Sequence, residues 1–394
     1  MSSLLAGDRI GSLLRELIAI PSENPPGDTT AIANFIASWY ADVPGSQVRT
    51  LAPPKKPSAP SIIATIGDGS APVVMLHAHI DTVPVGPSEM LSWESDPFIG
   101  EVRDEKIYGK GAVDDKGILA AMMCATRDLA PLLQGRGTMV LVAAAEEEVG
   151  GQLGTRWLAD QGHLPNCDFV VVGEQTGNAP ATAHKGVMRA TVTVRGRSTH
   201  ATNPDRGVSA IYAMAKVLSA LEVYHRELAL RVHPLVGNPT CNVGTIVGGS
   251  TTNSVPDTCT ITIDRRMVPR EDFAAVQAEV RAVVAAVDVA DASAEVGDFL
   301  ISSWFDASIE TGLAPTFVRA IEEITQAPSF KVGYLPGSDA KHLMGIARNG
   351  MLVFGPGSYE TAHAANEYVS VKDLQVATEI LKRFLSLAML EERA

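Results

Sequence analysis

The sequence predicts an α/β protein whose main domain is a mixed, mainly parallel sheet with helices on both faces. Four apolar runs of strand length indicate this, at residues 72–76, 138–145, 169–172 and 351–354. Such uninterrupted apolar strands are typical of a parallel sheet that is buried on both sides. A helix of small residues beginning near Ile118 separates two of these strands and supports the same fold class.

The middle of the chain predicts a second, inserted domain of a different kind. Polar and apolar residues alternate over 187–195 and again over 260–264, as in antiparallel strands with one exposed face. Helical patterns at about 208–223 and 273–287 give the order strand, helix, strand, strand, helix. We therefore expect a two-layer α+β domain at 184–297, inserted into a discontinuous domain formed by 1–183 and 298–394.

Composition limits the classes of partner and the compartment. The chain has 394 residues, 46% of them hydrophobic and 20% charged, and its net charge of −13 argues against binding to nucleic acid or to anionic lipid. No apolar run is long enough for a membrane span, and charged residues from Asp8 to Glu16 interrupt what would be a signal peptide. Four scattered cysteines form no CxxC pair, so we expect a cytoplasmic protein without disulfides.

The first strand is followed by a pair of residues that suits a metal ligand. His79 and Asp81 are two positions apart and face the same side of an extended chain. The carboxylate of Asp81 is therefore expected to accept the second N–H of the imidazole, which fixes the tautomer of a metal-bound histidine. The alternative is a polar loop that follows a strand.

Two further segments place acids where a cation would be useful. Asp114 lies in the Gly-rich turn 108–117, where it can bridge two cations or, alternatively, cap the following helix. Glu146, Glu147 and Glu148 follow a buried strand directly, and their mutual repulsion would be relieved by a nearby cation.

Glu174 ends another apolar strand, and His363 follows the last one. Ligands bind at the carboxyl ends of the strands in open α/β sheets. The sequence therefore predicts a hydrolase with a two-metal site whose ligands are His79, Asp114, Glu148, Glu174 and His363.

Five strings, in order along the chain, resemble the M20 metallopeptidase family: HAHIDTVP, GKGAVDDKG, AEEEVGG, GEQTG and TAHAANEYV. The resemblance implies a zinc-peptidase-like catalytic domain that holds two divalent ions, with zinc favoured and cobalt or manganese as alternatives. It implies that Asp114 bridges the ions, with His79 and Glu174 on one and Glu148 and His363 on the other. Glu147 matches the general base, Asp81 the acid that orients His79, and a cis peptide is implied between Asp114 and Asp115.

The resemblance also gives roles to residues outside the metal site. His200 is expected to reach a partner subunit's active site and stabilise the oxyanion, which implies a homodimer formed through the inserted domain. Arg266, with Asn253 and Ser338, matches the residues that bind the substrate's carboxylate. From the residues alone, His200 can be a solvated loop histidine, and Asn253 and Ser338 can serve plain turns.

The resulting prediction is a dizinc amidohydrolase that cleaves an N-acyl amino acid of the N-acetyl or N-succinyl type, as acetylornithine deacetylases and desuccinylases do. A dipeptidase or carboxypeptidase of the same family is the alternative, because both classes cut the same bond with the same residues. A non-catalytic dimeric binding protein on this scaffold is a third reading. No residue identifies the acyl group, and no second cation that would recognise a succinyl carboxylate can be located by spacing.

Overall fold

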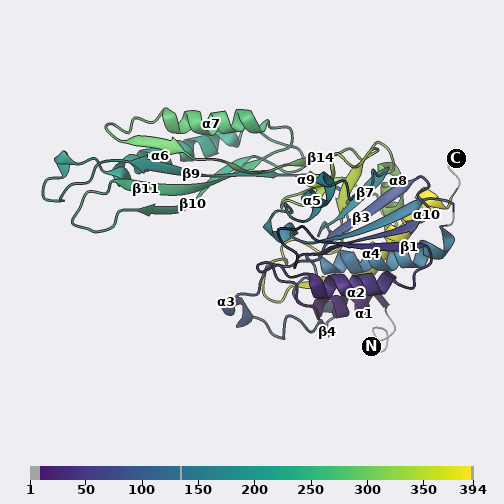
Figure 1. Ribbon diagram of the computed structural model, residues 1–394. Helices are drawn as coiled ribbons and strands as arrows, with labels where there is room; N and C mark the ends of the chain where they lie inside the picture. The colour runs from purple at the N-terminus through teal and green to yellow at the C-terminus, as the bar shows by residue number, and fades with distance from the viewer. Residues whose placement is uncertain (1–8, 134, 392–394) are drawn as a thin grey trace. The chain divides into compact units, whose positions relative to one another are not determined.

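The computed structural model describes residues 9–133 and 135–391, so Asp8 and the rest of residues 1–8 lie outside the described part, as do residues 134 and 392–394. The chain divides into two compact units. Unit 1 comprises residues 1–182 and 307–394, and unit 2 comprises residues 183–306. Each unit is described by itself below (Figure 1).

Unit 1 is built on a mixed sheet with a parallel centre. In order across the sheet, its strands are β1 (Ser46–Leu51), β2 (Ser61–Gly67), β6 (Thr138–Ala144), β3 (Val73–His79), β7 (Phe169–Gly173), β16 (Met351–Phe354), β8 (Ala181–His184) and β14 (Phe305–Asp306), with β15 (Val332–Tyr334) beside β8. The pairs β6–β3, β3–β7 and β7–β16 are parallel, and the outer pairs are antiparallel. The predicted fold class is confirmed. Residues 183–184 of β8 and both residues of β14 are assigned to unit 2, so the chain leaves unit 1 within β8 and returns to it directly after β14.

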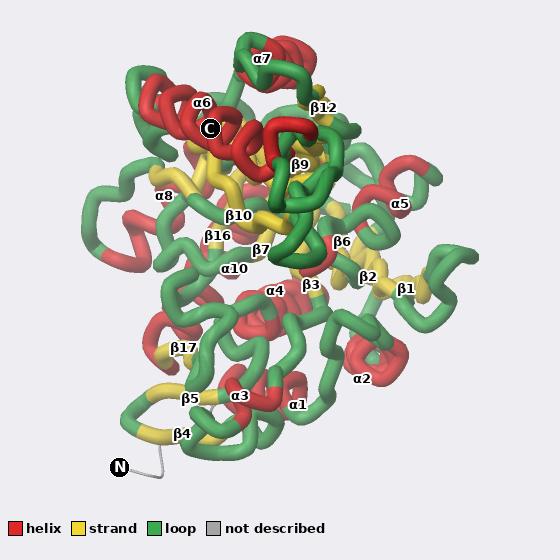
Figure 2. Tube along the Cα trace, turned by 90° about the vertical axis from the view of Figure 1, so that its left-hand side faces the viewer, coloured by secondary structure: helices red, strands yellow, loops and turns green. Residues whose placement is uncertain are grey.

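Helices cover both faces of this sheet (Figure 2). On one face, a single apolar core joins the strands to α1 (Arg9–Ile18), α2 (Thr30–Tyr40), α4 (Lys116–Leu129), α8 (Ala314–Thr325) and α10 (Val371–Met389). On the other face, Thr155 of α5 (Thr155–Asp160) is hydrogen-bonded to His77 of β3, and α9 (Ala340–Leu343) packs against α5. α3 (Pro87–Met90) and a small antiparallel sheet of β4 (Glu101–Arg103), β5 (Lys106–Tyr108) and β17 (Tyr368–Ser370) complete the unit.

The central helix α4 shows why small residues were needed after the Gly-rich turn. Twelve of its fourteen residues are buried, including Ala120, Ala121 and Ala125, because the helix lies between the sheet and both α1 and α10. Among the described residues, no helix has the length and the apolar character needed to cross a membrane.

Unit 2 is a two-layer α+β structure. Its elements in chain order are β9 (Gly186–Arg195), α6 (Ala210–Leu228), β10 (Thr240–Gly248), β11 (Thr258–Met267), α7 (Phe273–Ala285), β12 (Ser293–Val296) and β13 (Leu300–Ser302). The antiparallel sheet has the order β10-β11-β9-β12, and β13 also pairs with β9. Figure 1 shows α6 and α7 on one face of this sheet. Because β13 returns to β9, the unit extends to Asp306, beyond the limit of 297 expected from the sequence.

The apolar core of unit 1 gives a prediction about stability. Phe317 of α8 is fully buried, and its ring lies 5.0 Å from that of Phe354 and 4.8 Å from that of Phe384. We expect Phe317→Ala to lower the free energy of unfolding by about 3–5 kcal/mol, because it removes apolar contacts and leaves a cavity. Urea unfolding measures this change. Phe330→Ala, at a side chain that is 75% exposed, is the matched control and should change stability by less than about 0.5 kcal/mol.

Candidate metal centre

The five predicted ligands meet at one edge of the sheet of unit 1. His79 is the last residue of β3, Glu174 follows β7, and Glu148 lies in a 3-10 turn (Glu147–Val149) that follows β6. Asp114 lies in the turn between β5 and α4, and His363 lies between β16 and β17. Because β3, β6 and β7 are parallel, their carboxyl ends bring three of these side chains together.

Asp114 lies between the two histidines. Its Oδ1 is 2.9 Å from Nε2 of His79, and its Oδ2 is 3.1 Å from Nε2 of His363. The same Nε2 of His363 is 3.1 Å from Oε2 of Glu148. The peptide bond between Asp114 and Asp115 is cis, as expected. The two oxygens of one carboxylate therefore face two different imidazoles.

Glu174 belongs to a second group of candidate ligands, which includes a residue that the sequence prediction left out. His79, Asp114 and Glu148 form one group, and His79, Asp115 and Glu174 form another; within each group the ligand atoms lie within 4.8 Å of one another. Oδ2 of Asp115 accepts the backbone N–H of His79, and among the described residues its buried Oδ1 has no partner. Asp115 holds the N-cap position of α4 but makes no side-chain capping bond, so the capping alternative does not apply to it.

Asp81 orients His79 differently from the prediction. The Nδ1–H of His79 donates to the backbone carbonyl of Asp81 at 2.9 Å, whereas the nearest oxygen of the Asp81 carboxylate is 3.6 Å away. The carboxylate instead accepts the backbone N–H groups of Glu147 and Glu148, at 3.1 and 3.3 Å, and the amide of Asn24 at 2.8 Å. Asp81 thus fixes the imidazole through its carbonyl and the acidic turn through its side chain.

The three adjacent glutamates after β6 each face a different cationic side chain. Nζ of Lys56 is 2.5 Å from Glu146, Nζ of Lys341 is 3.5 Å from Glu147, and Nε2 of His363 is 3.1 Å from Glu148. Glu146 has a left-handed backbone (φ 72°), so the chain turns sharply there and sends the three side chains in different directions. Each of the three carboxylates therefore has its own cationic neighbour, which offsets the mutual repulsion expected from the sequence.

Lys56 belongs to a tightly packed group behind the acidic turn. Asn24 donates to Glu146 at 3.0 Å as well as to Asp81, so Lys56, Glu146, Asn24 and Asp81 form one chain of contacts. Gly27 closes this group: its φ is +77°, and a Cβ there would lie 2.4 Å from Nζ of Lys56 and 2.7 Å from Oε1 of Glu146. The loop at residues 53–57 therefore contributes a cation to the centre.

Lys341 was also missed, and it lies beside the predicted general base. Its ammonium donates to the carbonyl of Ser338 at 2.9 Å and lies 3.9 Å from Asp339. The hydroxyl of the fully buried Ser338 accepts the N–H of Ala340 at 3.3 Å, which favours the turn role left open for it. Burial raises the pKa of Glu147 to about 7, while the charge of Lys341 opposes this increase.

The donor set fits metal cations. Burial, reinforced by the charges of Asp114 and Asp115, holds the pKa of Glu174 well above its usual range. Hydrogen bonds with Asp114 and Glu148 raise the pKa of His363 to about 10. Both shifts reflect an excess of negative charge in a buried place, and two divalent cations held by these carboxylates and imidazoles would neutralise it.

The remaining predicted site residues lie in unit 2. His200 is exposed after β9, where its Nδ1 is 2.9 Å from Oγ1 of Thr202, and a β-bridge to Ser254 brings it beside the turn that contains Asn253. Arg266 lies on β11, and its side chain is partly exposed. Its neighbour Arg265 is fully buried and pairs with Glu271, so only Arg266 is available to a ligand.

Comparison with known proteins identifies the family of the chain. Residues 75–387 match the model of peptidase family M20/M25/M40. The acetylornithine deacetylase of Pectobacterium carotovorum is 28% identical over 393 residues, covering 95% of this chain and 96% of the relative. Two solved structures share the fold. An M20 metallo-carboxypeptidase from Sulfolobus solfataricus has a TM-score of 0.76 and 19% identity, covering 97% of this chain and 99% of the other. A dinuclear metal-binding M20 peptidase from Bacillus subtilis has a TM-score of 0.69 and 18% identity, covering 97% and 98%.

The family match covers most of the chain, and its range includes all five candidate ligands. The chain belongs to peptidase family M20/M25/M40 and is a metal-dependent hydrolase of amide or peptide bonds.

Proposed function

We propose that the protein hydrolyses the amide bond of an N-acyl amino acid, of the N-acetyl or N-succinyl type, using two divalent cations and Glu147 as general base. The position of Asp114 carries this proposal, because its two oxygens face different imidazoles. A carboxylate placed in this way can bridge two cations about 3.5–4 Å apart, the spacing of two-metal hydrolases.

In this proposal His79 and Glu174 would hold one cation, Glu148 and His363 would hold the other, and Asp114 would serve both. Because Nδ1–H of His79 donates to a carbonyl, its Nε2 lone pair is left for a metal. Zinc suits this mixture of carboxylates and imidazoles, and cobalt and manganese accept the same donors. When bound, the cations would supply an acidified water and polarise the amide carbonyl.

Glu147 takes a proton from the attacking water and returns it to the departing amine. The side chain is positioned from two directions, since its backbone N–H is anchored on Asp81 and its carboxylate lies beside Lys341. A pKa of about 7, raised by burial, suits proton transfer in both directions at neutral pH.

Residues of unit 2 complete the proposal. The exposed His200 of a partner subunit stabilises the oxyanion, and Asn253, which lies in the turn beside His200, contacts the substrate from the same side. Arg266 lies at the other end of β11 and binds the free carboxylate of the substrate. The hydroxyl of Ser338 is buried and already accepts a hydrogen bond, so Ser338 contributes through its carbonyl, which accepts a hydrogen bond from Lys341.

The relatives bear on the choice of substrate. Acetylornithine deacetylases that match over almost the whole chain favour an acyl amino acid. The fold shared with a metallo-carboxypeptidase keeps the dipeptidase or carboxypeptidase reading as the second candidate. The third reading, a non-catalytic binding protein, disagrees with membership of a family of metal-dependent hydrolases, and such a protein has no reason to retain a base and five ligands. The four cysteines are free and buried, which supports a cytoplasmic location.

A homodimer through unit 2 is also part of the proposal. β10 is an edge strand, and it carries the exposed side chains of Ile246 and Val247, which are 55% and 72% exposed. The neighbouring helix α6 exposes Tyr212 and Val223. An unpaired edge beside exposed apolar side chains is the kind of surface that a second copy covers.

The roles of two neighbouring glutamates give the first test. We expect Glu147→Gln to reduce kcat on N-acetyl amino acids by at least about 100-fold while the metal content stays at that of the wild type, because only proton transfer is lost. Glu148→Gln should reduce both activity and metal content. Amine release from a panel of N-acetyl, N-succinyl and N-formyl amino acids and dipeptides, with metal analysis by mass spectrometry, measures both quantities. Substantial activity in Glu147→Gln would refute its role, and cleavage of dipeptides alone would favour the second candidate.

Lys56 provides a second test, because it acts on Glu147 only through Glu146, Asn24 and Asp81. Lys56→Met leaves Glu146 buried without its cation, and we expect a loss of about 1–3 kcal/mol of stability. We also expect a lower kcat at unchanged KM, with partial recovery in Lys56→Arg. The exposed neighbour gives the control, since Lys55→Met should change neither quantity. A variant that loses stability but keeps its kcat would show that the ion pair is purely structural.

Sedimentation tests the dimer. The wild type should sediment at twice the 41.6 kDa mass of one chain. Val247→Asp places a charge on the edge strand, and we expect it to raise the dimer dissociation constant by about tenfold or more, equivalent to about 1.4 kcal/mol. Leu91→Asp, at a side chain of unit 1 that is 88% exposed, is the control and should not change the mass. A monomeric wild type would contradict the proposal.

A further inference from the structure

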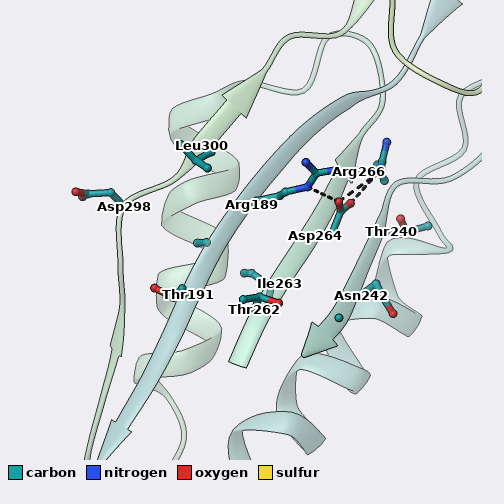
Figure 3. A pocket seen from close by; sticks show the side chains of 12 residues that line it. Arg189, Thr191, Thr240, Asn242, Thr262, Ile263, Asp264, Arg266, Asp298 and Leu300 are labelled. Atoms are coloured by element: carbon teal, nitrogen blue, oxygen red, sulfur yellow. Dashed lines mark hydrogen bonds and ion pairs between the residues drawn. The ribbon is translucent and has the colours of Figure 1, made fainter. Parts of the chain in front are cut away.

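The face of the unit 2 sheet opposite α6 and α7 carries an open cavity of about 730 Å³, to which charged and polar side chains contribute (Figure 3). Strand register explains its lining. Asp264 of β11 lies opposite both Arg189 of β9 and Asn242 of β10, and Arg266 lies opposite Thr240. Side chains two positions apart on a strand share a face, so Asp264 and Arg266 point to the same side. The intervening Arg265 points to the helices instead and is buried there.

Two guanidinium groups share one carboxylate in this cavity. Nε of Arg189 is 2.8 Å from Oδ2 of Asp264, and Nε of Arg266 is 2.7 Å from Oδ1 of the same residue. Figure 3 shows both arginines directed at Asp264. The three side chains together carry one net positive charge. Each guanidinium has five N–H donors, and Asp264 uses one from Arg189 and two from Arg266 at most, so donors remain for another anion.

The surroundings make this end of the cavity more positive. Lys185 precedes β9, and its pKa is lowered first by burial and then by the charges of Arg266 and Arg265. Its ammonium is bonded to the carbonyl of Asn238, which adds no negative charge. Asp298 also lines the cavity, but in Figure 3 its carboxylate lies apart from the arginine pair.

We propose that this cavity binds two anionic groups of one substrate, with Arg266 taking the carboxylate of the amino acid and Arg189 taking a second carboxylate. This inference rests on the proposed hydrolysis of an acyl amino acid and names its substrate class as doubly anionic. Residues in diagonal positions on adjacent strands lie about 7–8 Å apart, which is within the span of a short dicarboxylic chain. The second carboxylate belongs either to the amino-acid side chain or to the acyl chain. Arg189 is thus a specificity-determining residue.

Matched substrates that differ by one charge test this inference. N-acetylglutamate is compared with N-acetylglutamine, and N-succinylalanine with N-butanoylalanine, using metal-loaded enzyme. We expect kcat/KM to favour the doubly anionic member by at least about tenfold in one pair, equivalent to about 1.4 kcal/mol, and that pair identifies the source of the second carboxylate. Arg189→Met should abolish the preference. Arg195→Met is the control, because Arg195 lies on the same strand but outside the cavity, and it should keep the preference.

A binding measurement separates the failure of this inference from failure of the proposed function. Calorimetry compares glutarate with butyrate on metal-loaded wild type, Arg189→Met and Arg195→Met. If glutarate binds more tightly than butyrate and only Arg189→Met removes this difference, the cavity assignment is supported, whether or not any acyl amino acid is cleaved. Failure to cleave any acyl amino acid would overturn the proposed function and not the cavity assignment. The inference is overturned if the wild type shows no preference in either assay, or if Arg189→Met weakens both members of each pair equally.

Discussion

The need to balance negative charge in a buried place determines how this centre is built. Asp114, Asp115, Glu147, Glu148 and Glu174 gather at one edge of the sheet, and burial disfavours the charged form of each of them. Only at Asp114 do two imidazoles outweigh burial and lower the pKa of the carboxyl. Such a cluster persists in its ionised form only beside cations. The protein supplies some of these from its own side chains, and the rest of the charge is left for metal ions.

This constraint separates the acids into two groups: those whose charge is balanced by cationic side chains of the protein, and those that remain available to metal ions. Glu146 is satisfied by Lys56 and Asn24, so it has no reason to enter the metal site, although it is adjacent to the proposed base. Glu148 has no lysine or arginine partner among the described residues: one oxygen faces an imidazole that is itself a metal ligand by type, and the other accepts the backbone N–H of Val83. Glu147 lies between these cases, because Lys341 approaches it without forming a close pair. A base needs this intermediate condition, since a tight ion pair would hold its carboxylate permanently ionised.

The sequence predicted the parts of this centre that follow from strand endings. His79, Glu148 and Glu174 follow apolar runs, and parallel pairing requires such ends to meet, so their convergence was predictable. The hydrogen bond from His79 to the carbonyl of Asp81 was not predictable, because sequence spacing cannot show which oxygen of a residue faces the imidazole. Lys56 and Lys341 come from segments far from the acids along the chain, and no periodicity links them. Arg189 was missed for the same reason, because its partnership with Asp264 depends on register between strands 75 positions apart.

In the proposed function, the two units divide the work in a way that the amino-acid sequence only partly reveals. Hydrolysis requires a fixed set of acids and imidazoles, and a fixed set leaves recognisable strings in the sequence. Substrate choice requires only complementary charge and shape, which many residue combinations supply at different positions of a sheet. On the open face of unit 2, Arg266 and Asp264 are two positions apart in one strand, but the additional charge comes from another strand. The residues that select the substrate in such a protein are therefore found from the register between strands and not from sequence motifs.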